Sequence, residues 1–199
     1  MGVFVWGDNQ MMMKARKKAL RTFLAAVLAI SLVPAEPVHA SLNILGGYLI
    51  QATPFDHKVQ TSGILQFYSF APRLESVRSS DELFAQARSI RYVQDGATDY
   101  WQSPQETESR WAGDCEDKAV WLYMNMKQNG YFNARLVIGR YRQADKGYHV
   151  WVTLPDGQDN FFILDPTAQK KIWKASDFND GSYKPLFSFE GTNRYRHSV

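Results

Sequence analysis

The sequence contains a single cysteine, Cys115, and residues able to activate a thiol follow it along the chain. A thiol is mostly protonated near neutral pH, whereas the nucleophile is the thiolate. An adjacent imidazole can take the thiol proton to form a thiolate–imidazolium pair, and a carboxylate commonly holds the second nitrogen of that imidazole. His149 and Asp165 are the candidates for these two roles. The three residue types together predict nucleophilic catalysis by a thiol.

Among the four histidines, His149 has the most regular surroundings. His39 precedes an expected cleavage site, His197 lies in the C-terminal tail, and His57 lies in a segment without a clear pattern. His149 opens an alternating stretch, so His149 and Trp151 should share one face of a strand. His149 is therefore the predicted base.

A hairpin is predicted to bring the carboxylate to the imidazole. Residues 147–154 and 161–165 read as strands, joined by a turn over Pro155-Asp156-Gly157. Val150, Val152 and Leu154 should face the side opposite His149. Antiparallel pairing of the two strands would place Asp165, the last residue of the second, near His149.

The thiol is predicted to lie in the first turn of a helix. Asp114 is a suitable N-cap, and Asn129-Gly130 is a suitable stop. An apolar stripe with helical spacing runs between them, consisting of Ala119, Leu122, Tyr123 and Met126. Free N–H groups in the first turn stabilise an anion, and the N–H of Cys115 itself is a candidate oxyanion donor.

The remaining pattern predicts an α+β domain. Two further helices are expected, over residues 79–90 and 103–110, each opened by a serine with a glutamate three residues later. Strands are expected at residues 134–142 and 185–189, and residues 42–50 and 64–70 suggest only short elements. Helices that precede an antiparallel sheet are typical of an α+β fold.

The N-terminus predicts export. Five basic residues in the region 14–21 precede an apolar stretch, 22–33, and the sequence Val38-His39-Ala40 ends in a small residue. These are the three parts of a secretory signal peptide, with cleavage expected after Ala40 and residues 1–10 read as a doubtful extension. Residues 41–199 are then one domain, which has no membrane span. Without residues 1–40 the formal net charge falls from +3 to zero, so no electrostatic feature indicates a nucleic-acid partner.

Each candidate taken singly also has a structural explanation. A lone helical cysteine is more often a small buried side chain, a strand histidine is commonly structural, and Asp before Pro is a common turn. An exported protein normally pairs its cysteines as disulfides, which Cys115 cannot do within the chain. The joint occurrence of Cys115, His149 and Asp165 therefore favours catalysis.

Three sequence blocks resemble a known family. They are Trp111-Ala-Gly-Asp-Cys-Glu-Asp-Lys-Ala119, then Gly-Tyr-His149-Val-Trp-Val, then Phe-Ile-Leu-Asp165-Pro-Thr. They are similar to the Cys, His and Asp blocks of the transglutaminase-like superfamily. With the preceding Asp99-Tyr100-Trp101-Gln-Ser-Pro104, they resemble most the bacterial transglutaminase-like cysteine proteinases, which include periplasmic proteases that cleave large adhesins. The resemblance covers roughly residues 92–167.

The resemblance implies a papain-like α+β core with the nucleophile helix packed on an antiparallel sheet. It implies Cys115 as nucleophile, His149 as general base and acid, and Asp165 as the residue that orients the imidazole. The adhesin-cleaving members bind calcium with acidic residues around the cysteine, and the matching positions are Asp114, Glu116 and Asp117. The alternative is that these three acids only cap the helix and favour its dipole. The chemistry itself requires no cofactor.

The aromatic and amide residues before the cysteine are candidates for lining the cleft or donating to an oxyanion. They are Trp101, Gln102 and Trp111, and core packing is the alternative role for the tryptophans. The expected function is an exported, periplasmic cysteine peptidase or amidase that acts on a protein or peptide. Acyl transfer to an amine and a non-catalytic binding module on the same fold remain the alternatives.

Overall fold

A computed structural model describes residues 46–63, 77–142, 147–158, 160–178 and 180–198. These residues belong to one unit, Asn43–Val199. The expected signal peptide over residues 1–40, its doubtful extension 1–10 and the short element near residues 64–70 lie outside the described residues. No helix among the described residues is long and apolar enough to cross a membrane.

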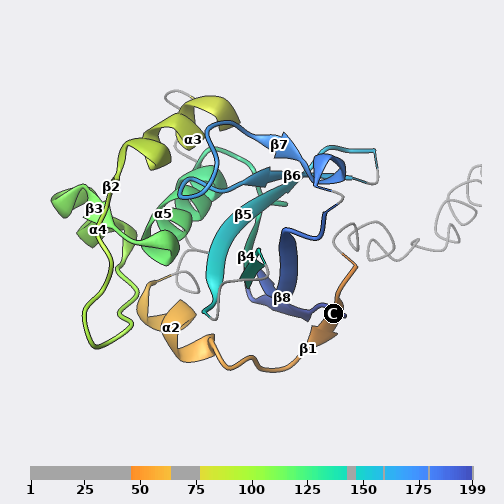
Figure 1. The fold of residues 1–199 in the computed structure, drawn as a ribbon, viewed down its shortest axis with the longest axis horizontal. Helices are drawn as coiled ribbons and strands as arrows, with labels where there is room; N and C mark the ends of the chain where they lie inside the picture. The colour runs from red at the N-terminus through yellow and green to blue at the C-terminus, as the bar shows by residue number, and fades with distance from the viewer. Residues whose placement is uncertain (1–45, 64–76, 143–146, 159, 179, 199) are drawn as a thin grey trace, which may run out of the picture. The chain divides into compact units, whose positions relative to one another are not determined.

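Short helices precede most of the strands along the chain (Figure 1). Within the described residues the helices are α2 (Asp56–Thr61), α3 (Ser80–Ser89), α4 (Pro104–Arg110) and α5 (Cys115–Gln128), and η3 (Ala175–Asp177) is a 3₁₀ turn. The strands are β1 (Tyr48–Ile50), β2 (Arg91–Tyr92), β3 (Ala112–Gly113), β4 (Arg135–Tyr141), β5 (His149–Pro155), β6 (Phe161–Leu164), β7 (Trp173–Lys174), β8 (Tyr183–Glu190) and β9 (Asn193–Arg196).

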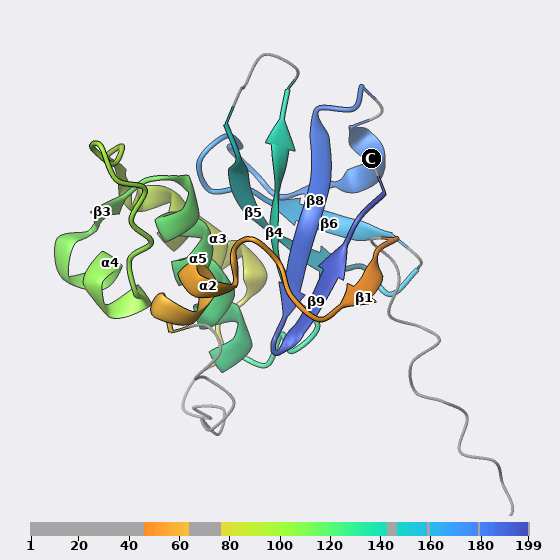
Figure 2. The same ribbon diagram turned by 90° about the horizontal axis from the view of Figure 1, so that it is seen from below.

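Seven strands form one antiparallel sheet, in the order β1-β9-β8-β4-β5-β6-β7. Helices α3, α4 and α5 lie together on one side of it (Figure 2). Strands β2 and β3 form a separate, parallel pair that leads directly into α5. The predicted α+β fold, with a helix packed on an antiparallel sheet, is confirmed.

The predicted helix starts are confirmed by their side-chain caps. The Ser79 hydroxyl accepts the Glu82 N–H at 3.2 Å, while the Glu82 carboxylate accepts the Ser79 N–H at 2.7 Å. Ser103 and Glu106 repeat this reciprocal pair at the start of α4, at 3.3 and 2.7 Å. Each pair satisfies two N–H groups that would lack partners at a helix end, which is why these short helices begin at fixed residues.

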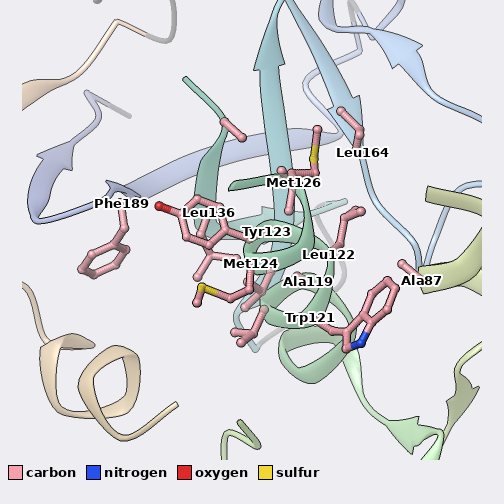
Figure 3. Packing of buried hydrophobic residues seen from close by; sticks show 14 of the residues in the cluster. Ala87, Ala119, Trp121, Leu122, Tyr123, Met124, Met126, Leu136, Leu164 and Phe189 are labelled. Carbon is pink, nitrogen blue, oxygen red and sulfur yellow. The ribbon is translucent and has the colours of Figure 1, made fainter. Parts of the chain in front are cut away.

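Helix α5 forms the centre of the main core. The predicted stripe of Ala119, Leu122, Tyr123 and Met126 is buried against Leu136, Leu164 and Phe189 of the sheet (Figure 3). Its other side is buried as well, since α3 and α4 also pack on it. Burying one such large side chain contributes roughly 1.5–3 kcal/mol, so the packing holds the first turn of α5 in a fixed place.

The opposite face of the sheet carries a smaller cluster. Val137, Trp151 and Ile163 form it, with Phe178 and Tyr183 packed against them. Val150 and Val152 belong to the core on the α5 side, so the predicted alternation along β5 is confirmed. A Cβ at Gly139 would lie only 2.6 Å from the Trp151 ring and 2.2 Å from the Lys184 carbonyl oxygen. Glycine at this position allows β8 and the indole to pack closely beside the start of β5.

Candidate active site

Cys115 is the first residue of α5, as the sequence predicts. Its backbone N–H therefore lacks a partner within the helix, as do the next N–H groups. The side chain is half-buried. The backbone N–H of Val150 donates a hydrogen bond to the sulfur, which lowers the pKa of Cys115. The thiol thus lies against the His149–Val150 step of β5, so the first turn of α5 and the first residues of β5 form one site.

The predicted histidine–carboxylate pair is present in the structure. His149 Nε2 lies 2.7 Å from Asp165 Oδ2. The pairing of Val152 with Leu164 brings the end of β6 to the start of β5, and Asp165 directly follows Leu164. With Nε2 held by the carboxylate, Nδ1 is the ring nitrogen left to exchange a proton with another group.

Asp165 is fully buried, and both of its carboxylate oxygens are satisfied. Oδ1 accepts the N–H groups of Thr167 and Ala168 at 3.0 and 2.9 Å, and Oδ2 accepts the Tyr183 hydroxyl at 2.8 Å. Burial alone would raise the pKa of Asp165. The hydrogen bond and charge of His149, with the bonds from Ala168 and Tyr183, outweigh burial and lower that pKa. Asp165 is therefore a fixed anion that orients the imidazole and stabilises its protonated form.

Tyr183 and Gln169 extend this network behind the carboxylate. Gln169 Nε2 donates to the Tyr183 hydroxyl at 2.9 Å and to the Tyr141 hydroxyl at 3.3 Å. Burial and the Asp165 charge raise the pKa of Tyr183, so its hydroxyl remains a proton donor to Asp165. The ring of Tyr141 lies against His149, with 5.5 Å between the ring centroids.

Carboxylates also gather near the thiol. Glu116 Oε2 lies 3.0 Å from Cys115 Sγ, and oxygens of Asp95, Asp99 and Glu116 lie within 4.8 Å of one another. Asp114, Cys115 and Glu116 form a second group, whose carboxylate oxygens and sulfur also lie within 4.8 Å of one another. We call Asp95, Asp99, Asp114 and Glu116 the acidic cluster. One buried oxygen of Asp114, Oδ1, has no hydrogen-bond partner within the described part of the chain.

The acidic cluster opposes ionisation of its own members and of the thiol. Burial, followed by a hydrogen bond with Asp114, raises the pKa of Glu116 to about 9. Burial is also the main cause that raises the pKa of Cys115, followed by the charge of Glu116, and the Val150 N–H only partly offsets these effects. A thiolate at Cys115 therefore requires positive charge beside the sulfur, from an imidazolium or a bound cation.

Asp117, the third candidate calcium ligand, has a different role from Asp114 and Glu116. Its Oδ1 accepts the Gln102 N–H at 2.8 Å, and its Oδ2 accepts the Gln102 side-chain amide at 2.6 Å and the Asp114 N–H at 3.2 Å. It is fully buried and closes the start of α5. The structure thus fits the capping interpretation for Asp117, and Asp95 and Asp99 join the acidic cluster in its place.

Two of the candidates for an oxyanion donor, Gln102 and Trp101, already donate to other groups. Gln102 donates its side-chain N–H groups to Asp117 and, at 3.4 Å, to the Ala112 carbonyl. Trp101 is buried and donates its indole N–H to Asp99 at 3.1 Å. Trp111 ends α4 and packs edge-on against Trp121. Gln102 and Trp101 therefore have no free side-chain donor for an oxyanion, whereas the backbone N–H of Cys115 at the start of α5 remains a candidate.

Comparison with known proteins identifies the fold. The model of the transglutaminase-like superfamily matches residues 72–166, which contain the cysteine, histidine and aspartate positions. A search of curated proteins found no match.

Solved structures of LapG from Legionella pneumophila are similar to this chain. One form is 21% identical with a TM-score of 0.52, and the aligned region covers 73% of this chain and 81% of the LapG chain. The calcium-bound form is 22% identical with a TM-score of 0.52 and the same coverage. The EGTA-treated form is 21% identical with a TM-score of 0.53, and the aligned region covers 75% of this chain and 81% of the LapG chain. At these identities the similarity establishes a shared fold.

Proposed function

Because this chain belongs to the transglutaminase-like superfamily, we propose that it is a thiol hydrolase that cleaves amide bonds in a protein or peptide. The observation that carries the proposal is the 2.7 Å contact between His149 Nε2 and Asp165 Oδ2, beside a thiol at the first residue of a buried helix. Cysteine, histidine and aspartate are the three groups that a thiol acyl-transfer reaction needs.

In the proposed reaction, His149 takes the Cys115 proton and the sulfur attacks the substrate carbonyl carbon. The N–H of Cys115 and the positive end of α5 stabilise the resulting oxyanion. The imidazolium then gives its proton to the leaving amine as the carbon–nitrogen bond breaks, which leaves a thioester on the sulfur. Water, deprotonated by His149, attacks the thioester and releases the acid and the thiol. Asp165 holds the imidazole and stabilises its charged form throughout.

The alternative fate of the thioester is transfer to an amine, which would cross-link proteins. The two reactions differ only in whether water or an amine reaches the acyl group. A single substrate, incubated with and without an excess of a primary amine, separates them by mass spectrometry of the product. Mostly free acid supports hydrolysis, whereas mostly amide product supports transfer. No turnover of either kind would favour a binding module.

The acidic cluster fits a calcium ion by its chemistry. Calcium takes six to eight oxygen ligands, mainly carboxylates and carbonyls. Asp95, Asp99, Asp114 and Glu116 would supply carboxylates, and the unpartnered Asp114 Oδ1 offers a free acceptor. A bound calcium would supply positive charge beside the thiol. The calcium-bound form of LapG supports the same proposal.

We also propose that residues 1–40 direct the protein out of the cytoplasm, to the periplasm in a cell with an outer membrane. The basic, apolar and small-residue parts of this segment support export. Sequencing the N-terminus of the protein recovered from the exported fraction tests it, with Ser41 as the expected first residue.

Replacing Tyr183 by Phe should lower kcat/KM about tenfold, because the variant removes a hydrogen bond to a buried charge worth about 1.5–3 kcal/mol. Without that donor the pKa of Asp165 should rise, and the carboxylate loses one of the contacts that fix it against the imidazole. The measurement is kcat/KM on one peptide substrate, compared with the wild type.

Tyr141→Phe is the matched control, because the Tyr141 hydroxyl bonds Gln169 and not Asp165. It should leave kcat/KM unchanged. Equal kcat/KM for Tyr183→Phe and the wild type would show that Tyr183 only packs against its neighbours.

A further inference from the structure

Lys58 of α2 contacts the acidic cluster, and no step described above uses it. Its ammonium forms an ion pair with Asp99 Oδ2 and also donates to the Asp99 backbone carbonyl at 3.2 Å. Asp99 lies 41 residues further along the chain, so the fold and not the local sequence makes this contact. Lys58 thus brings a positive charge to the edge of a cluster of carboxylates.

Both oxygens that Lys58 contacts are of the kinds that calcium takes as ligands, a carboxylate oxygen and a backbone carbonyl oxygen. The other carboxylate oxygen of Asp99, Oδ1, already accepts the Trp101 indole N–H at 3.1 Å. Ligand oxygens of Asp95, Asp99 and Glu116 lie within 4.8 Å of one another. A cation that binds among these three carboxylates therefore meets the Lys58 ammonium at Asp99.

The acidic cluster retains room for a cation beside Lys58. Among the described residues, Lys58 is the only basic side chain that forms a salt bridge with any of its four carboxylates. Asp114 is buried, and its Oδ1 has no hydrogen-bond partner in the described part of the chain. One ammonium beside four carboxyl groups leaves the cluster acidic, so it still attracts cations.

The helix that carries Lys58 is anchored, whereas the end of the lysine side chain is accessible to solvent. Val59 is fully buried in the main core, and the buried ring of Phe55 stacks on Trp101 with 6.4 Å between the ring centroids. The side chains of Lys58 and Asp99 are 29% and 62% exposed. Water therefore reaches the ion pair, and the ammonium is able to leave Asp99 while the backbone of α2 stays in place.

We propose that Lys58 is a tethered competitor for the acidic cluster, with an ammonium that occupies Asp99 until a calcium ion displaces it. Lysine suits this role because its charge is compact and its stem is flexible. Displacement breaks the ion pair and places calcium close to a like charge. Lys58 therefore weakens calcium binding and sets the calcium concentration at which the site fills. The inference rests on the calcium site proposed above and does not depend on the hydrolase function.

The first test is isothermal titration of the metal-free protein with calcium chloride, which needs no catalysis. Lys58→Met should bind calcium about fivefold more tightly than the wild type, as expected when one partly exposed ion pair no longer opposes binding. Lys184→Met removes the same charge from an exposed residue of β8, so its affinity should stay within about twofold of the wild type.

The outcomes of this titration separate the proposals. Equal calcium affinity in Lys58→Met and the wild type would overturn the role of Lys58. Weaker binding in Lys58→Met would also overturn it, because Lys58 would then position Asp99 for the metal. No calcium binding by either protein would overturn the calcium site together with this inference, and would leave the hydrolase function to its own test.

The second test follows the displacement in the wild-type protein. Lysine side chains are acetylated briefly with acetic anhydride in EGTA and in millimolar calcium chloride, and mass spectrometry gives the rate at each lysine. Calcium should raise the rate at Lys58 at least about twofold, because the amine no longer pairs with Asp99. The rate at Lys184 should not change. A rate at Lys58 that calcium lowers or leaves unchanged would overturn the displacement, whatever the calcium affinity of Lys58→Met.

Discussion

Replacement of His149 by Ala is expected to reduce amide hydrolysis by about a thousandfold or more. General acid–base catalysis contributes on the order of 10²–10⁴ in rate, and the thioester cannot form efficiently when neither the thiol nor the leaving amine has a proton partner. The variant should also lose the reaction of Cys115 with iodoacetamide below pH 7, because burial disfavours the thiolate and no imidazolium remains to offset it. Both rates are measured on the same preparation, the alkylation as a function of pH.

His57→Ala is the matched control for this experiment. His57 is an exposed residue of α2 and contributes to none of the contacts at the thiol. Its replacement should leave both rates within about twofold of the wild type. The hydrolysis and alkylation rates of Asp165→Asn should lie between those of His149→Ala and His57→Ala, because the imidazole remains but loses its anionic partner. If His149→Ala keeps the wild-type alkylation profile, the imidazole does not activate the sulfur and the proposed mechanism fails.

The parts of this site that could be predicted are those set by local pattern. The serine caps at Ser79 and Ser103, and the helix stop at Asn129, depend on residues within one turn of each other. The approach of Asp165 to His149 follows from a hairpin with a short turn, in which the alternation of residues fixes the register. Local chemistry therefore led to the histidine–carboxylate pair without knowledge of the whole fold.

The parts that could not be predicted depend on elements distant in the sequence. Tyr183 reaches Asp165 because β8 pairs with the far edge of β4, a strand order that no local pattern specifies. Asp95 and Asp99 meet Glu116 because the two-residue β2–β3 ladder folds an irregular loop back over α5. Its place before the cysteine makes Gln102 a candidate for lining the cleft or donating to an oxyanion, but sequence position does not give the direction of a side chain, and Gln102 turns toward Asp117.

After divalent cations are removed, the free energy of unfolding of the protein is expected to decrease as the pH rises from about 5 to 9. Burial, followed by the hydrogen bond with Asp114, raises the pKa of Glu116 from its ordinary value of 4.5 to about 9 in the folded protein. Between these values the folded state binds more protons than the unfolded state, so the free energy of unfolding decreases with increasing pH. The Asp117 pKa, raised to about 6 chiefly by burial, acts in the same direction over the lower part of this range. Since one pKa unit corresponds to about 1.4 kcal/mol, the loss should be at least about 2 kcal/mol.

The measurement is urea unfolding at several pH values in EGTA and again in millimolar calcium chloride. Calcium should raise the urea midpoint of unfolding most at high pH, because there it replaces the protons that neutralise the neighbouring carboxylates at lower pH. Glu116→Gln should flatten the pH dependence in EGTA and weaken the response to calcium. Asp81→Asn removes an exposed carboxylate from the first turn of α3 and should preserve both effects. A wild-type protein whose stability in EGTA is independent of pH, or unchanged by calcium at pH 9, would rule out a cation-binding role for the acidic cluster, whatever the activity of the thiol.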